Sequence, residues 1–160
     1  MAVLISKFKN VFLLLGILAV VLVTLGIVQS VNQNKNKRNP ASFFGIKGSE
    51  VESVKVIGVN GLFENILTRE EDYWVVSNKG DYRVNPDYMI DLLDIFENMP
   101  RGELASRNVE KHEELQVDSL GVNIQAWNKD GEQIVDAIIG KEGPGFLTTY
   151  MRQANSDNVY

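Results

Sequence analysis

The chain has 160 residues, with no cysteine and a single histidine. These counts exclude a disulfide framework, a lipidated-cysteine anchor and the clustered Cys and His ligands of a zinc site. The net charge is −5, and residues 39–160 alone hold 11 Lys and Arg against 21 Asp and Glu, a net charge of −10. Because such a domain repels phosphate, nucleic acid is excluded as its partner.

An unbroken apolar stretch follows a short N-terminal tail, residues 1–10. Residues 11–28 contain no charged side chain, and 18 residues of helix would rise about 27 Å, close to the hydrocarbon thickness of a bilayer. The stretch therefore predicts a single transmembrane helix. A cleaved secretory signal is the alternative, since lysines 7 and 9 supply a basic flank, but the apolar regions of signals run only about 7 to 15 residues.

The charges around this span do not determine its orientation. Basic residues stand on both sides, at positions 7 and 9 and within residues 35–38. The short N-terminal tail favours a tail inside the cytoplasm and a domain outside it, and a cytosolic domain on a reversed anchor is the alternative. Residues 29–40, rich in Asn, Gln and Lys, predict a polar tether between the span and the domain.

Residues 41–160 predict one α+β domain of mostly antiparallel sheet with one main helix, in the order β-β-β-α-β-β-β. The first three strands are expected at residues 51–59, 62–67 and 73–76, where β-branched and aromatic residues gather. The last three are expected at residues 122–127, 134–139 and 146–153. Val159 and Tyr160 resemble the start of a further strand, which suggests a domain truncated at its C-terminus.

The main helix is expected directly after the third strand. Asn85 suits the N-cap and Pro86 the first helical position, and Pro100 ends the pattern. The apolar residues between them recur at one helical face, at positions 89, 92, 93, 96 and 99. That face is predicted to pack on the sheet. The charged residues 109–115 predict a second, short helix.

Several short motifs occur in a fixed order along residues 51–160. The first are a Trp-containing strand at residues 72–76 and, at residues 82–99, a Pro-Asp helix start with a leucine-rich helix. Four strand motifs follow: one that begins with Gly121 at 121–127, Ile-Gly-Lys at 139–141, Tyr-x-Arg within 149–152 and Val-Tyr at 159–160. In these motifs the chain resembles the domain of unknown function 4340 family. The resemblance implies a bacterial, membrane-anchored accessory protein of the envelope, in some members encoded beside ABC-type export or gliding-associated permeases. It implies no catalytic residue and no cofactor.

The sequence holds no pattern typical of a catalytic or metal site. His112 lies in a charged segment and is interpreted as a surface histidine, so neither a Ser-His-Asp triad nor a metal site is predicted. The glycines of residues 140–145 are not followed by the Lys-Ser/Thr of a phosphate loop and predict a turn. Clustered carboxylates are interpreted as a solvated face rather than a glycosidase pair or calcium site, at 70–72, 110, 113, 114 and 118.

Four residues are candidates for binding a partner: Trp74, Trp127, Tyr150 and Arg152. The two tryptophans are expected in the core, with an aromatic patch beside Tyr150, for a sugar or a protein, as the alternative. Arg152 is a candidate anchor for an acidic partner, with an internal salt bridge as the alternative.

The leading hypothesis is a single-pass, non-enzymatic accessory subunit of an ABC-type transporter or other bacterial envelope complex. Its domain would lie on the extracytoplasmic side of the cytoplasmic membrane, and its partner would be a polytopic membrane protein. The alternative is a membrane-tethered carbohydrate- or cell-wall-binding module, whose glycan groove would be lined by Trp74, Trp127 or Tyr150. An enzyme would need further residues from a missing C-terminal region.

Overall fold

The computed structural model describes residues 42–160. The predicted transmembrane helix, residues 11–28, and the whole of the predicted tether, residues 29–40, lie outside the described residues. None of the helices in residues 42–160 combines the length and the apolar sequence that a bilayer crossing requires.

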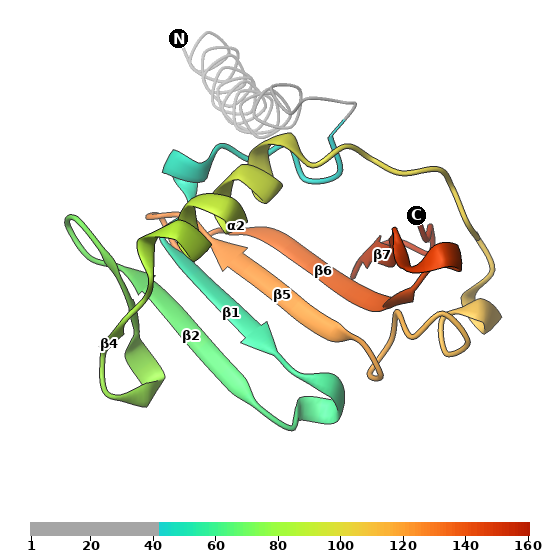
Figure 1. Ribbon diagram of the computed structural model, residues 1–160, viewed down its shortest axis with the longest axis horizontal. Helices are drawn as coiled ribbons and strands as arrows, with labels where there is room; N and C mark the ends of the chain where they lie inside the picture. Colours follow the sequence, from blue (N-terminus) through green and yellow to red (C-terminus); the bar gives the residue numbers. More distant parts are fainter. Residues whose placement is uncertain (1–41) are drawn as a thin grey trace, which may run out of the picture. The chain divides into compact units, whose positions relative to one another are not determined.

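Residues 42–160 form a seven-stranded antiparallel sheet and one α-helix, as expected for an α+β domain (Figure 1). The strand order is β4-β3-β2-β1-β5-β6-β7. The strands are β1 Ser53–Ile57, β2 Glu64–Arg69, β3 Trp74–Val76, β4 Tyr82–Arg83, β5 Val122–Trp127, β6 Gln133–Glu142 and β7 Thr149–Gln153. Strand β4 was not predicted, because two residues are too few for an alternating pattern to be recognised.

Several predicted elements differ from the structure. Strand β1 is shorter than residues 51–59, β2 is shifted from residues 62–67, and β6 continues to Glu142 through residues for which a turn was predicted. The last strand begins at Thr149 rather than 146, because the chain first makes a 3₁₀ turn over Pro144–Phe146. The short helix expected over residues 109–115 is a 3₁₀ turn over Val109–Lys111 followed by hydrogen-bonded turns. Short 3₁₀ segments of this kind leave no mark in the hydrophobic periodicity.

Helix α2, Pro86–Asn98, begins at the predicted residue with the predicted N-cap and ends one residue before Met99, the last position of the predicted apolar pattern. The side chain of Asn85 accepts a hydrogen bond of 3.0 Å from the backbone N–H of Asp87 and thereby satisfies one of the free N–H groups at the helix start. Met99 caps the other end, directly before Pro100. The predicted apolar face is the buried one, since Met89 and Phe96 are its fully enclosed residues.

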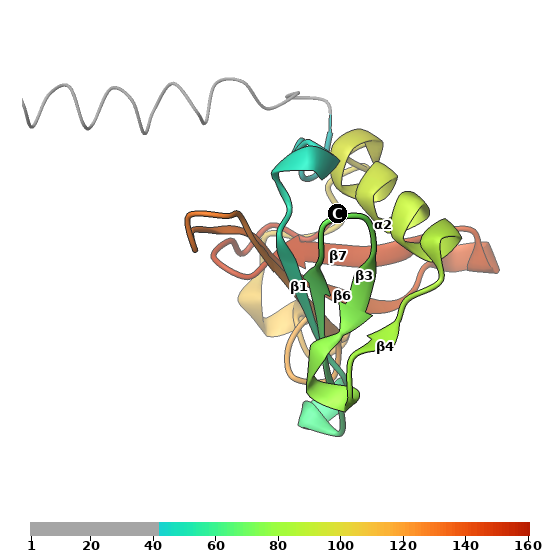
Figure 2. The ribbon, with the colours of Figure 1, turned by 90° about the vertical axis from the view of Figure 1, so that its left-hand side faces the viewer.

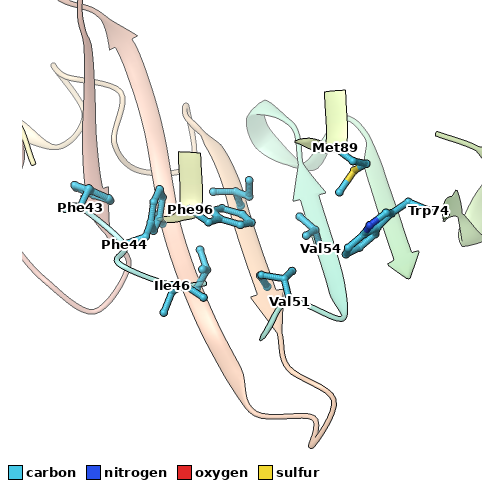
Figure 3. Close-up of a cluster of buried hydrophobic side chains, with 12 residues drawn as sticks. Phe43, Phe44, Ile46, Val51, Val54, Trp74, Met89 and Phe96 are labelled. Atoms are coloured by element: carbon cyan, nitrogen blue, oxygen red, sulfur yellow. The ribbon is translucent and has the colours of Figure 1, made fainter. Parts of the chain in front are cut away.

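The main core lies between α2 and one face of the sheet (Figure 2). A short N-terminal segment, residues 43–46, also covers this face, with Phe44 packed edge-on against Phe96 at 5.3 Å between ring centroids. Figure 3 shows Met89 beside Val54 and Trp74, so the helix covers β1 and β3 as well. The sheet contributes alternate residues of its strands to this core, among them Val54, Ile124, Ala126, Val135 and Ala137.

A second, smaller apolar cluster covers the opposite face at β6 and β7. Ile138 points to this face because its neighbours 137 and 139 point to the main core. It packs with Tyr150 against Leu115, Val117 and Val159. The connection from α2 to β5 supplies two of these residues as it runs around the β7 side of the sheet (Figure 1).

The last two residues lengthen the sheet beyond β7. Tyr160 and Met151 exchange two backbone hydrogen bonds, of 2.8 and 2.9 Å, and Val159 exchanges hydrogen bonds with Ser106 and Ala105 on its other side. The strand-like pairing predicted for Val159 and Tyr160 is therefore present as bridges to two segments. Val159 is fully buried, so these residues are an integral part of the fold.

The fold explains why a glycine stands in the Ile-Gly-Lys motif. A Cβ atom at Gly140 would lie 2.3 Å from the carbonyl oxygen of Leu115, and that oxygen accepts the backbone hydrogen bond of Lys141. Because both contacts are with backbone, the two segments would have to separate to admit a side chain.

We predict that Gly140→Ala lowers the free energy of unfolding by about 1–3 kcal/mol, the usual range for overpacking a tight contact. Gly102→Ala is the matched control, because a Cβ there meets nothing within 4 Å. Urea denaturation of both variants measures the difference. Equal stability of the two would show that the 115–117 segment can move away from β6 at no cost.

Candidate interaction surfaces

Trp74 lies in the main core rather than on a surface. Its side chain is 7% exposed, and the guanidinium of Arg69 lies over its ring at 4.9 Å from the centroid. The same guanidinium donates hydrogen bonds to the backbone carbonyls of Val51 and Gly48, at 2.9 and 2.8 Å. Trp74 thus agrees with the core interpretation of the sequence.

Trp127 and Tyr150 are both partly buried, and Tyr150 packs in the cluster on the opposite face of the sheet. Trp127 follows the core residue Ala126 and so alternates to that same opposite face, which corrects its expected place in the core. Trp127 pairs with Gln133 at one end of β6, whereas Tyr150 adjoins residues 139–142 at the other end. At about 3.3 Å per residue, these positions are roughly 20 Å apart along the sheet. The structure therefore does not bring the three aromatic rings together into one groove.

Arg152 is engaged by the protein's own backbone. Its guanidinium donates hydrogen bonds to four carbonyl oxygens, those of Val117 (2.7 Å), Gln153 (3.2 Å), Ala154 (2.9 Å) and Ser156 (3.2 Å). These bonds join β7 to the 117 segment and to the turn that leads to Val159. Arg152 is thus held by carbonyl groups rather than by the carboxylate that the sequence suggested.

His112 is buried, 7% exposed, which corrects its interpretation as a surface histidine. Its Nε2 atom lies 3.2 Å from the carbonyl oxygen of Asp157, a contact between segments 45 residues apart. The charged neighbours misled the sequence interpretation, because they occupy the outer side of the same turn. In residues 42–160 no three His, Asp or Glu side chains are grouped to hold a metal ion.

The carboxylates around His112 face solvent. Glu114 accepts a hydrogen bond of 2.6 Å from Lys111, which lowers the pKa of Glu114 and raises that of Lys111. Asp118 accepts a hydrogen bond from the backbone N–H of Leu120 and so shapes a turn. Both arrangements are local, and neither pairs two carboxylates across a cleft.

A small polar recess lies at the β7 side of the domain. It is lined by Phe43, Arg101, Gln153, Ser156, Asn158 and Tyr160. Arg101 lies over the ring of Tyr160, at 5.5 Å from the centroid. The recess contains neither a carboxylate side chain nor a histidine, so it offers no pair for acid–base catalysis.

The outer face of α2 combines acidic and large apolar side chains. Asp87, Asp91 and Asp94 follow spacings of four and three, which places them in one row along the helix. Large apolar residues flank the row: Tyr88 is 71% exposed, Ile90 63% and Ile95 43%. We call these six residues the α2 outer face. Neither of the two ion pairs within residues 42–160 involves it.

The turn between β6 and β7 presents two further apolar side chains. Phe146 is 82% exposed and Leu147 90% exposed. We call residues 143–147 the β6–β7 tip. The sequence analysis assigned Phe146 to a strand, where it would have been half-buried. The preceding Gly-Pro-Gly is the signal that could have placed both residues on a turn.

The domain is thus an α+β fold with one helix across a seven-stranded sheet, and within residues 42–160 it exposes large apolar side chains on α2 and at the β6–β7 tip. The family described as domain of unknown function (DUF4340) matches residues 74–160, and the chain belongs to this family. The match extends from β3 to Tyr160 and includes both named surfaces. Comparison with the curated proteins and with the solved structures found no match.

We predict that Arg152→Ala lowers the free energy of unfolding by about 2–3 kcal/mol, because four partly buried carbonyls lose a charged donor. Arg152→Lys should recover only part of this loss, since a single ammonium group cannot reproduce the guanidinium fork. Arg107→Ala, at an exposed arginine, is the control and should stay within about 0.5 kcal/mol. Unchanged stability of Arg152→Ala in denaturant titrations would return Arg152 to the candidates for partner binding.

Proposed function

We propose that the protein is a single-pass, non-enzymatic accessory subunit of a bacterial envelope complex, and that it binds a polytopic membrane partner, such as an ABC-type transporter, through the α2 outer face. The observation that supports this proposal most strongly is the exposure of Tyr88, Ile90 and Ile95 on one helix. The solvent side of a surface helix is normally polar. Each Å² of apolar surface that a partner buries there contributes about 25 cal/mol to the free energy of binding.

The charge of the helix indicates the chemistry of the partner. Residues 86–98 include four acidic side chains and no basic one, and the last helical turn lacks the basic residue that would balance the negative end of the helix dipole. A partner segment with Lys or Arg would complement both the acidic row and the helix end. Such complementarity mainly accelerates association and sets its direction.

The membrane part of the proposal is supported by the sequence. Residues 11–28 have the length and composition of a transmembrane helix. The resemblance in the motifs implies an accessory envelope protein, in some members encoded beside ABC-type export or gliding-associated permeases. In this proposal the domain lies on the extracytoplasmic side of the cytoplasmic membrane, where it can contact the loops of a polytopic subunit.

The glycan-binding alternative has weaker support. It needs aromatic rings along one groove, whereas Trp74 is buried on one face and Trp127 and Tyr150 lie far apart on the other. Among these three candidates, stacking on a sugar would therefore depend on a single partly buried ring.

The test is recovery of partners from native membranes in mild detergent, followed by mass spectrometry. Wild-type protein should bring permease and ATPase subunits in a fixed ratio. The double variant Tyr88→Ala/Ile90→Ala should recover at least about tenfold less, because aromatic and aliphatic anchors dominate interface energies.

Leu62→Ala is the matched control, since Leu62 is 81% exposed but lies in the β1–β2 turn. It should recover the partner as well as wild type, and all variants should keep wild-type stability, because exposed substitutions usually change it by less than about 0.5 kcal/mol. Equal recovery by the double variant would refute the role of α2. Isolation of wild-type protein without any polytopic partner would refute the proposed function itself.

A further inference from the structure

Backbone hydrogen bonds order the β6–β7 tip, which presents two exposed apolar side chains. Gly143 donates a backbone hydrogen bond of 2.9 Å to Thr148, and Phe146 donates one of 3.2 Å to Gly143. Phe146 has a φ of 59°, which is uncommon for a residue other than glycine. Because the backbone of the turn is already ordered, burial of Phe146 and Leu147 would cost mainly the rotamer entropy of the two side chains.

The tip also lies in a stretch of the chain that has no acidic residue. Residues 143–156 contain no Asp or Glu, although residues 39–160 contain 21 of them. Glu142 precedes this stretch and Asp157 follows it. The stretch itself includes one charged side chain, Arg152, which is bound by carbonyls. An anionic surface would thus repel most of the domain and leave this turn free to approach.

The predicted membrane anchor would hold the domain beside a surface that can bury exposed apolar side chains, the lipid bilayer. If residues 11–28 cross a bilayer, as the proposed function requires, the domain is permanently close to lipid. The 13 residues 29–41 can span up to about 45 Å. The carbonyl of Phe43, next to the start of the described chain, accepts a hydrogen bond from Gln153 at the far end of β7. Since β7 is only about 17 Å long, its tip lies within the reach of the tether.

We propose that Phe146 and Leu147 insert into the interfacial zone of the bilayer that holds the anchor. Phe and Leu are side chains that interfacial segments bury at the boundary between head groups and acyl chains. Two residues alone would bind lipid weakly, but the tether makes the contact intramolecular and raises its effective concentration. The inference rests on the membrane anchor of the proposed function and adds a second, lipid-facing contact to it.

The test uses the full chain in phosphatidylcholine nanodiscs that contain no other protein. Because the chain has no cysteine, Thr148→Cys introduces a single site for an environment-sensitive fluorophore and leaves Phe146 and Leu147 intact. Lys129→Cys, at the exposed turn between β5 and β6, is the matched control. Lipids with a nitroxide quencher on the acyl chain should quench the label at residue 148 several-fold more than the label at residue 129.

Phe146→Ser/Leu147→Ser in the Thr148→Cys background should reduce quenching to the level of the control, which shows that the side chains, not the fluorophore, make the contact. Equal quenching at 148 and 129 in chains retained by the nanodisc would overturn the inference while the anchor stands. Failure of the chain to stay with the nanodisc would refute the anchor and the inference together. Protection of residue 148 only in native membranes would also overturn it, because a protein would then cover the tip.

Discussion

The structure depends on the burial of one sheet face beneath α2 and residues 43–46. Phe96 is fully buried there, and it meets strands whose core-facing positions alternate between larger and smaller side chains, such as Ile124 and Ala126. A close-packed interior requires this matching of volumes. One helix and one short segment provide the cover for this face, so the whole inner face of α2 is used by the core.

This use of the helix determines what remains outside. With Met89 and Phe96 turned inward, the helical repeat places Asp87, Asp91 and Asp94 on the solvent side, and Tyr88, Ile90 and Ile95 at its margins. The acidic row suits a soluble surface, whereas the large apolar margins do not. The proposed protein contact is therefore formed by apolar residues of α2 that the core does not bury, rather than by a cleft.

On the opposite face of the sheet, close contacts with the backbone of the 115–117 segment hold that segment against β6 and β7. Leu115 comes so near to β6 that only glycine fits at position 140, and Arg152 joins β7 to Val117 through a carbonyl. Other contacts within the protein involve polar side chains that the sequence analysis placed at the surface. The Nε2 atom of His112, for example, lies 3.2 Å from the carbonyl oxygen of Asp157. In residues 42–160 the exposed side chains include large apolar ones on α2 and at the β6–β7 tip, and both surfaces lie outside the second, smaller apolar cluster.

The sequence by itself determined the start of α2, strand β5 to the residue and the general course of the other long strands, because caps and hydrophobic periodicity are local properties. It did not identify β4, whose two residues carry too little pattern, and it placed the turn before β7 at residues 140–145, although β6 continues to Glu142 and the turn includes Phe146. Only the tertiary structure determined which groups the individual side chains contact. Arg152 meets Val117, and His112 meets Asp157, across 35 and 45 residues of chain, and no local pattern specifies such partners. The exposure of Phe146 and Leu147 was also decided by the tertiary structure, because local sequence can indicate a turn but not whether another segment of the chain will cover its side chains.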